Sequence, residues 1–120
     1  MLIAGKVWEN PLDLGADVVT MSTYKSLGGP PGGAIITNDA GIAEKIDRIA
    51  FPGMTAYFDA AKSAALAVTM LDWRDFVKEY VAEMVLMAKT LASSLEEYDI
   101  PIFFGALGHT QSHQFAVLAE

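Results

Sequence analysis

The segment from Ala16 to Thr37 constrains the fold most, because it joins two short apolar runs through a rigid turn. It reads ADVVTMSTYKSLGGPPGGAIIT. The first run, Asp17–Ser22, is rich in β-branched residues and favours a strand, whereas the glycines and prolines of residues 28–33 favour a turn. A second strand is expected at Ala34–Thr37. The order strand, turn, strand places one lysine, Lys25, at the mouth of the turn.

The residues around this segment predict an α/β fold with a parallel sheet. Val18, Val19 and Met21 are too continuously apolar for a strand with one solvated face, so a sheet covered on both faces is expected. After the second strand, Asn38 or Asp39 is placed to cap a helix whose isoleucines recur at helical spacing. That helix is expected to end by residue 50, before Phe51 and Pro52.

Lys25 is the candidate for chemistry. A lysine at the end of an apolar strand is partly desolvated, which lowers its pKa and frees the amine to attack carbonyl compounds. The hydroxyls of Ser22 and Thr23 precede the lysine on the same turn and could bind a phosphate, and the glycines let the backbone approach a ring closely. These features predict a site for pyridoxal phosphate. The alternative is an ordinary surface lysine before a hairpin loop.

The run TMSTYKSLGGPPGGAII resembles the cofactor-lysine segment of the serine hydroxymethyltransferase family, one of the fold-type I pyridoxal phosphate enzymes. Strand, hydroxyls, lysine, glycine turn and strand follow in the order of that family. The resemblance implies a Schiff base between the cofactor and Lys25, which is therefore the predicted catalytic residue. It implies cofactor contacts from a set of residues around that lysine: Ser22, Thr23, Tyr24, Gly32 and Gly33.

A second candidate site for cofactor contacts is the loop Phe51–Tyr57. It is similar to the family's Phe-Pro-Gly segment, which leads to a glycine pair that contacts the cofactor phosphate of the neighbouring subunit. Here Met54 and the residues after it stand where the glycines would lie. Thr55 is predicted to supply a hydroxyl to the cofactor instead, with Tyr57 as a second possibility. The alternative is a plain connection between helices.

Three departures from the family pattern point to a divergent branch. Tyr24 stands where the family has a histidine, and Pro31 where it has an arginine, so one cationic contact is lost. The glycines of the phosphate loop are also missing.

The resemblance implies a pyridoxal phosphate-dependent enzyme of the serine/glycine hydroxymethyltransferase type, acting on a small-molecule amino acid. Such an enzyme breaks or forms a Cα–Cβ bond and transfers a one-carbon unit, with tetrahydrofolate as a candidate co-substrate. Alternatives are another fold-type I enzyme, either an aldolase or an aminotransferase, and a catalytically silent fragment. Neither the acid that pairs with the cofactor's ring nitrogen nor an arginine placed for a substrate carboxylate is found, so weak or absent turnover is expected of the isolated chain.

At 120 residues the chain is short for such an enzyme, and it is interpreted as a central fragment. The expected parts belong to an aspartate-aminotransferase-like (fold-type I) enzyme: the end of the cofactor-binding large domain (1–72), a long connecting helix (73–98) and the start of the small domain (99–120). Small residues at 58–72 predict a buried or interface helix, and the resemblance implies a homodimer there.

A second helix is expected at 75–97, amphipathic and with methionines as core filler. Its predicted apolar stripe comprises Phe76, Tyr80, Met84, Met87, Leu91 and Leu95, beside Val77, Val81, Val85 and Ala88. A short strand at 102–104 and a further apolar run from Phe115 follow. His113 precedes that run and is expected to be a buried or strand-edge histidine with a backbone partner.

Composition excludes several other classes of function. Eight basic against fifteen acidic residues give a net charge of −7, and no run of Lys or Arg occurs, which argues against nucleic acid as a partner. No apolar run reaches the roughly 20 residues needed to cross a bilayer. The absence of cysteine fits a cytoplasmic protein, and with only two histidines no metal site is expected.

Overall fold

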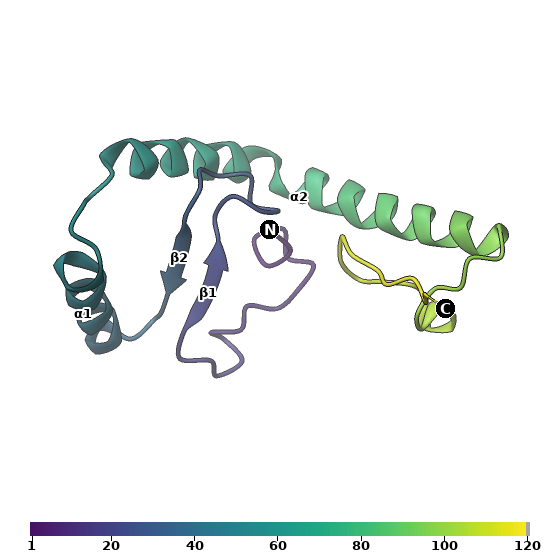
Figure 1. The fold of residues 1–120 in the computed structure, drawn as a ribbon, viewed down its shortest axis with the longest axis horizontal. Helices are drawn as coiled ribbons and strands as arrows, with labels where there is room; N and C mark the ends of the chain where they lie inside the picture. The colour runs from purple at the N-terminus through teal and green to yellow at the C-terminus, as the bar shows by residue number, and fades with distance from the viewer. Residues whose placement is uncertain (120) are drawn as a thin grey trace. The chain divides into compact units, whose positions relative to one another are not determined.

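The computed structural model describes residues 1–119. Figure 1 shows the ribbon, with two strands and two principal helices labelled. The chain divides into two compact units: Met1 with Trp8–Asp75, and Leu2–Val7 with the chain from Phe76 onward.

In the first unit, strands β1 (Val19–Ser22) and β2 (Gly33–Ile36) form an antiparallel hairpin in which Ser22 lies opposite Gly33. The predicted strands are confirmed, but the predicted parallel pairing is wrong among the described residues. The physical reason is the connection: residues 23–32 form a short loop, whereas parallel neighbours need a crossover of a dozen residues or more.

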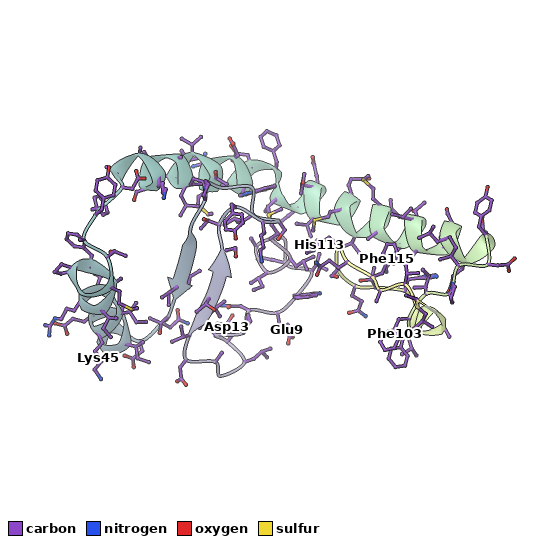
Figure 2. All side chains as sticks on the ribbon, viewed as in Figure 1. Glu9, Asp13, Lys45, Phe103, His113 and Phe115 are labelled. Atoms are coloured by element: carbon purple, nitrogen blue, oxygen red, sulfur yellow. The ribbon has the colours of Figure 1, made fainter. Side chains whose placement is uncertain are left out.

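Helix α1 (Ala40–Arg48) follows β2 and begins as the sequence predicts. The Asp39 carboxylate accepts a hydrogen bond from the backbone N–H of Ile42 at 2.8 Å, which caps the helix. Figure 2 shows Lys45 pointing away from the hairpin on the outer side of α1. A short segment with π-helical hydrogen bonding, η1 (Ile49–Met54), continues α1 but is broken at Phe51, where the backbone is extended (φ −145°, ψ 128°) ahead of Pro52.

Helix α2 (Ala60–Glu97) is a single helix of 38 residues. The sequence predicts two helices here, with a break near residue 73, and this expectation is wrong. No glycine or proline lies between residues 60 and 97, so nothing in the backbone chemistry interrupts the helix. Asp59 accepts a hydrogen bond from the N–H of Lys62 at the start, and Asp99 adopts a left-handed conformation (φ 61°) just after the end.

The predicted apolar stripe of the second half of α2 is also wrong in part. Its large side chains are more than half exposed: Phe76 (62%), Tyr80 (52%), Met87 (68%) and Leu91 (55%). The buried face is the neighbouring one and consists mostly of smaller residues: Val77, Val81, Ala88 and Ala92. Small side chains let other chain segments approach the helix closely. A Cβ built on Gly5 would lie only 2.9 Å from the Cβ of Val81.

The core of the second unit also contains Leu2 and Ile102, which are 7% and 6% exposed. The strands expected near residues 102–104 and 115–118 are reduced to a single antiparallel bridge, Ile102 to Val117. A short 3-10 helix, η2 (Gly105–Leu107), lies between them. Figure 2 shows Phe115 on the C-terminal segment that runs beside the second half of α2.

In the second unit, the Nε2 of His109 lies 2.7 Å from the Glu96 carboxylate, which joins the end of α2 to the following loop. His113 is exposed and makes no hydrogen bond within residues 1–119, so the expectation of a buried or strand-edge histidine is wrong. Within the described chain, no helix is long and apolar enough to cross a membrane.

Candidate functional site

The hairpin brings six of the seven predicted site residues together. Ser22 ends β1 and Gly33 begins β2 directly opposite it. The residues between them, 23–32, form what we call the lysine loop. Lys25 lies in it as an exposed side chain, so the expectation that this lysine is partly desolvated is wrong. The lysine therefore projects from the end of a two-stranded ladder.

Thr23 is the residue that fixes the shape of the lysine loop. It is only 3% exposed, and three of its polar groups bond across the loop. Its N–H donates to Gly32 O at 3.0 Å, and its C=O accepts from the Gly29 N–H at 2.7 Å. Its hydroxyl donates to Pro30 O at 2.6 Å. Because the hydroxyl proton is engaged in the loop, Thr23 can offer only an acceptor to any ligand as the loop stands.

A tight turn follows directly after Thr23 and contains Lys25. The Gly28 N–H donates to Lys25 O at 2.8 Å, which closes the turn from residue 25 to residue 28. Gly28 has a φ of +69°, a conformation that glycine adopts without a steric penalty. The backbone of Lys25 is thus fixed on both sides, by Thr23 before it and by Gly28 after it.

The first half of helix α2 packs against the lysine loop. The indole Nε1 of Trp73 donates to Leu27 O at 2.7 Å, and Leu27 is 9% exposed. Leu66 lies two helical turns earlier on the same face, and its Cδ1 would lie 3.2 Å from a Cβ built on Gly29. Sequence reasoning missed both residues. The available signal was their spacing of seven, which places them on one face of a helix with Thr69 between them.

Three of the predicted site residues carry polar side chains that remain available to a ligand. Within residues 1–119, the Ser22 hydroxyl, the Tyr24 phenol and the Lys25 amine make no hydrogen bond or ion pair. Tyr24 is 55% exposed. The loop therefore holds its backbone rigidly while it leaves an amine, a hydroxyl and a phenol free. A phosphorylated aldehyde such as pyridoxal phosphate requires an amine to attach its aldehyde, a hydrogen-bond donor for its phosphate and an aromatic group beside its ring. The residues present therefore fit that cofactor.

Thr55 is not part of this cluster. It follows η1, and both its N–H and its hydroxyl bond to Ala50 O, at 3.0 and 2.6 Å. Tyr57 is 78% exposed and its phenol makes no hydrogen bond within the described residues. The predicted contacts of Thr55 and of the loop residues with a cofactor stay predictions.

One other place in the described residues is a depression to which no chemistry is assigned. An open depression at the far end of the hairpin is lined by Gly15, Ala16, Asp17, Asn38 and Asp39, but the Asp39 carboxylate already caps α1. Within residues 1–119, no three His, Cys, Asp or Glu side chains are grouped so that they could hold a metal ion.

Thr23→Val is expected to lower the free energy of unfolding by about 1–3 kcal/mol, because the partly buried carbonyl of Pro30 loses its donor. Valine keeps the shape of threonine, so the change isolates the hydroxyl. Urea denaturation followed by circular dichroism measures the effect. Thr23→Ser keeps the hydroxyl and is the matched control; equal stability of the valine variant and the wild-type chain would contradict the role of Thr23 as the brace of the loop.

An unpaired lysine amine on a braced turn is a geometry suited to covalent attachment of a carbonyl compound. Comparison with known proteins identifies the class more closely. The family model described as serine hydroxymethyltransferase matches residues 1–117. The chain belongs to the serine hydroxymethyltransferase family.

Individual relatives agree with this assignment. An alpha-methylserine aldolase from a Ralstonia species is 53% identical over 99% of this chain. A serine hydroxymethyltransferase from Sulfolobus acidocaldarius is 41% identical over 97% of it. The chain spans 27% of the length of each of these relatives.

A solved structure shares the fold. The crystal structure of L-threonine transaldolase from Pseudomonas fluorescens, in its internal aldimine state, matches 97% of this chain with a TM-score of 0.90 and 30% sequence identity. The chain covers 27% of that protein. The α/β fold expected from the sequence is confirmed at this level, as helices with a small sheet.

Proposed function

We propose that this chain carries the cofactor-lysine segment of a pyridoxal phosphate-dependent enzyme that breaks or forms Cα–Cβ bonds of amino acids. One observation carries the proposal. Lys25 projects an unpaired amine from a turn whose backbone is held at Thr23, at Gly28 and, through Leu27, at Trp73. Membership of the serine hydroxymethyltransferase family supports the same reading.

The residues in and beside the lysine loop have different chemical roles in this proposal. The Lys25 amine would hold the cofactor through its aldehyde carbon, and as a free amine it would be a group able to move a proton. The Ser22 hydroxyl donates to the phosphate, and the Tyr24 phenol supplies an aromatic face and a hydrogen-bonding group. Bound pyridoxal phosphate supplies an electron sink for the charge that develops at the substrate's Cα. The glycines at 32 and 33 keep side chains out of that space.

A second candidate function is that of an aldolase that acts on an α-methyl-β-hydroxy amino acid. The observation that favours it is the higher identity to the alpha-methylserine aldolase, 53% against 41% for the hydroxymethyltransferase. Breaking the Cα–Cβ bond of α-methylserine releases formaldehyde and leaves alanine once Cα is protonated. The measurement is formaldehyde release by the full-length protein from α-methylserine without tetrahydrofolate. Conversion of serine to glycine only when tetrahydrofolate is present to accept the one-carbon unit would favour the hydroxymethyltransferase reaction instead.

Several wider features belong to the same proposal. The enzyme is a homodimer of fold-type I, with the large domain ending near residue 72 and the small domain starting near residue 99. Exposed apolar side chains on the first half of α2, such as Val68 (58%) and Leu71 (54%), support an interface there. Thr55 reaches the phosphate of the neighbouring subunit's cofactor, which requires its hydroxyl to leave Ala50 O. The protein is cytoplasmic, as its lack of cysteine suggests, and the isolated chain turns over weakly or not at all.

The test of this proposal is chemical mapping of the attachment site. Pyridoxal phosphate is added to the purified chain, the absorbance of the protein-bound cofactor is recorded, and borohydride is used to make the link permanent. Peptide mapping then identifies the modified lysine. Modification confined to Lys25 supports the proposal. Equal labelling of the other lysines, among them Lys45 and Lys89, or no labelling, would overturn the assignment of Lys25.

A further inference from the structure

The contact between helix α2 and the lysine loop involves one peptide unit in particular. The indole N–H of Trp73 donates to Leu27 O at 2.7 Å, although the two residues are 46 positions apart. Leu27 is 9% exposed and the bond is partly buried, so it is partly shielded from competing water.

The peptide unit that Trp73 holds is the one that closes the turn on Lys25. The carbonyl of Leu27 and the N–H of Gly28 belong to the same planar group and point in opposite directions. On one side the carbonyl accepts from Trp73; on the other side the N–H donates to Lys25 O at 2.8 Å. Because the group is rigid, the indole bond sets the orientation of the bond to Lys25, and the two bonds polarise each other.

Packing supports the same alignment. Cζ2 of the Trp73 ring would lie 3.9 Å from a Cβ built on Gly28, so the ring lies close to the turn at its left-handed residue. Leu66, on the same face of α2, abuts Gly29. The face of α2 that carries Leu66 and Trp73 therefore lies close to Gly28, the last residue of the turn, and to Gly29, the residue after it.

We propose that Trp73 is a positioning residue for Lys25. Its indole N–H orients the Leu27–Gly28 peptide, and this peptide fixes the turn that presents the lysine amine. The consequence for attachment rests on the function proposed above, whereas the effect on the turn itself does not.

The test compares Trp73→Phe, which keeps an aromatic ring but removes the N–H, with Trp8→Phe, the same substitution at the chain's other tryptophan. Two quantities are measured. One is the amide hydrogen exchange rate of Gly28 without cofactor, which reports on the bond to Lys25 O. The other is the rate of borohydride-trapped attachment of pyridoxal phosphate at Lys25, relative to the other lysines.

Trp73→Phe is expected to speed Gly28 exchange and to slow attachment at Lys25, each by about tenfold, with labelling of the other lysines and the helix content unchanged. Trp8→Phe should leave both rates at the wild-type value. Unchanged rates in Trp73→Phe would overturn the proposal. Faster exchange at all protected amides together with a lower melting temperature would also overturn it, because that pattern indicates a general role in stability.

A second variant separates the N–H from the shape of the ring. In a Trp8→Phe background, a benzothiophene analogue of tryptophan at position 73 keeps the bicyclic shape and replaces the N–H by sulfur. It should reproduce the Trp73→Phe rates, and wild-type rates would overturn the proposal even if Trp73→Phe fails to fold. If the wild-type chain attaches no cofactor at Lys25, the proposed function fails, but Gly28 exchange still decides whether Trp73 orients the turn.

Discussion

Replacing Lys25 with arginine is expected to abolish covalent attachment of pyridoxal phosphate to the chain. Both side chains are long and cationic, so the exposed position tolerates either, and the fold should be retained. Guanidinium groups have a pKa about 2 to 3 units above that of an ordinary lysine amine, so the neutral nucleophile is roughly 100 to 1000 times rarer. The measurement is the yield of borohydride-trapped adduct at the peptide containing residue 25.

The matched control is Lys45→Arg, because Lys45 points away from the hairpin on α1 and has the same substitution chemistry (Figure 2). It should give the wild-type yield of adduct at Lys25. Attachment that continues in Lys25→Arg at the wild-type rate, through any other lysine, would show that the braced turn has no part in the chemistry.

Gly29→Ala is expected to destabilise the chain by about 1–3 kcal/mol, the usual range for adding a methyl group to a packed site. A Cβ at this position would lie 2.9 Å from the carbonyl oxygen of Thr23 and 3.2 Å from Cδ1 of Leu66. The first neighbour is backbone held by the Gly29 N–H itself, so it cannot move away without breaking a 2.7 Å hydrogen bond. Urea denaturation measures the loss, and the same variant should attach pyridoxal phosphate at Lys25 more slowly.

Gly33→Ala is the stability control for that experiment. Its Cβ would lie 3.4 Å from Met21 O, at the edge of ordinary van der Waals contact. The free energy of unfolding should therefore stay within about 0.5 kcal/mol of the wild-type value, as for substitutions that meet no steric obstacle. Equal stability of the two alanine variants would mean that the loop relaxes around residue 29. The close packing between Thr23 and Gly29 would then contribute nothing to the free energy of unfolding.

Local chemistry was enough to predict the two strands, the turn between them and the first helix, but not the antiparallel pairing of the strands. β-branched residues at Val18 and Val19, the glycine-proline run and the Asp39 cap each act over a few residues, and the structure contains the corresponding elements. The break at Phe51 and Pro52 is local for the same reason, since proline restricts itself and the residue before it.

Features that depend on distant residues could not be predicted in the same way. The contact of Trp73 with Leu27 joins residues that no short-range pattern relates. The choice between two neighbouring faces of α2 depends on what packs there, and small residues such as Ala88 and Ala92 are buried while the larger Met87 is exposed. Hydrophobic size alone favours the wrong face. The role of Thr23 as a brace was likewise hidden, because a threonine beside a lysine looks the same whether its hydroxyl faces a ligand or the loop.

The two kinds of contact around Lys25 also imply an order of folding. The Thr23 hydroxyl bonds to a residue seven positions away, whereas Trp73 bonds to one 46 positions away. Closing the longer loop costs about 1.7 kcal/mol more in chain entropy, from the logarithmic dependence on loop length. We therefore expect the hairpin and its lysine turn to form first and α2 to dock onto them later. On unfolding this order reverses, so the helix can detach, and the turn can lose its bond from Trp73, while the hairpin is still paired.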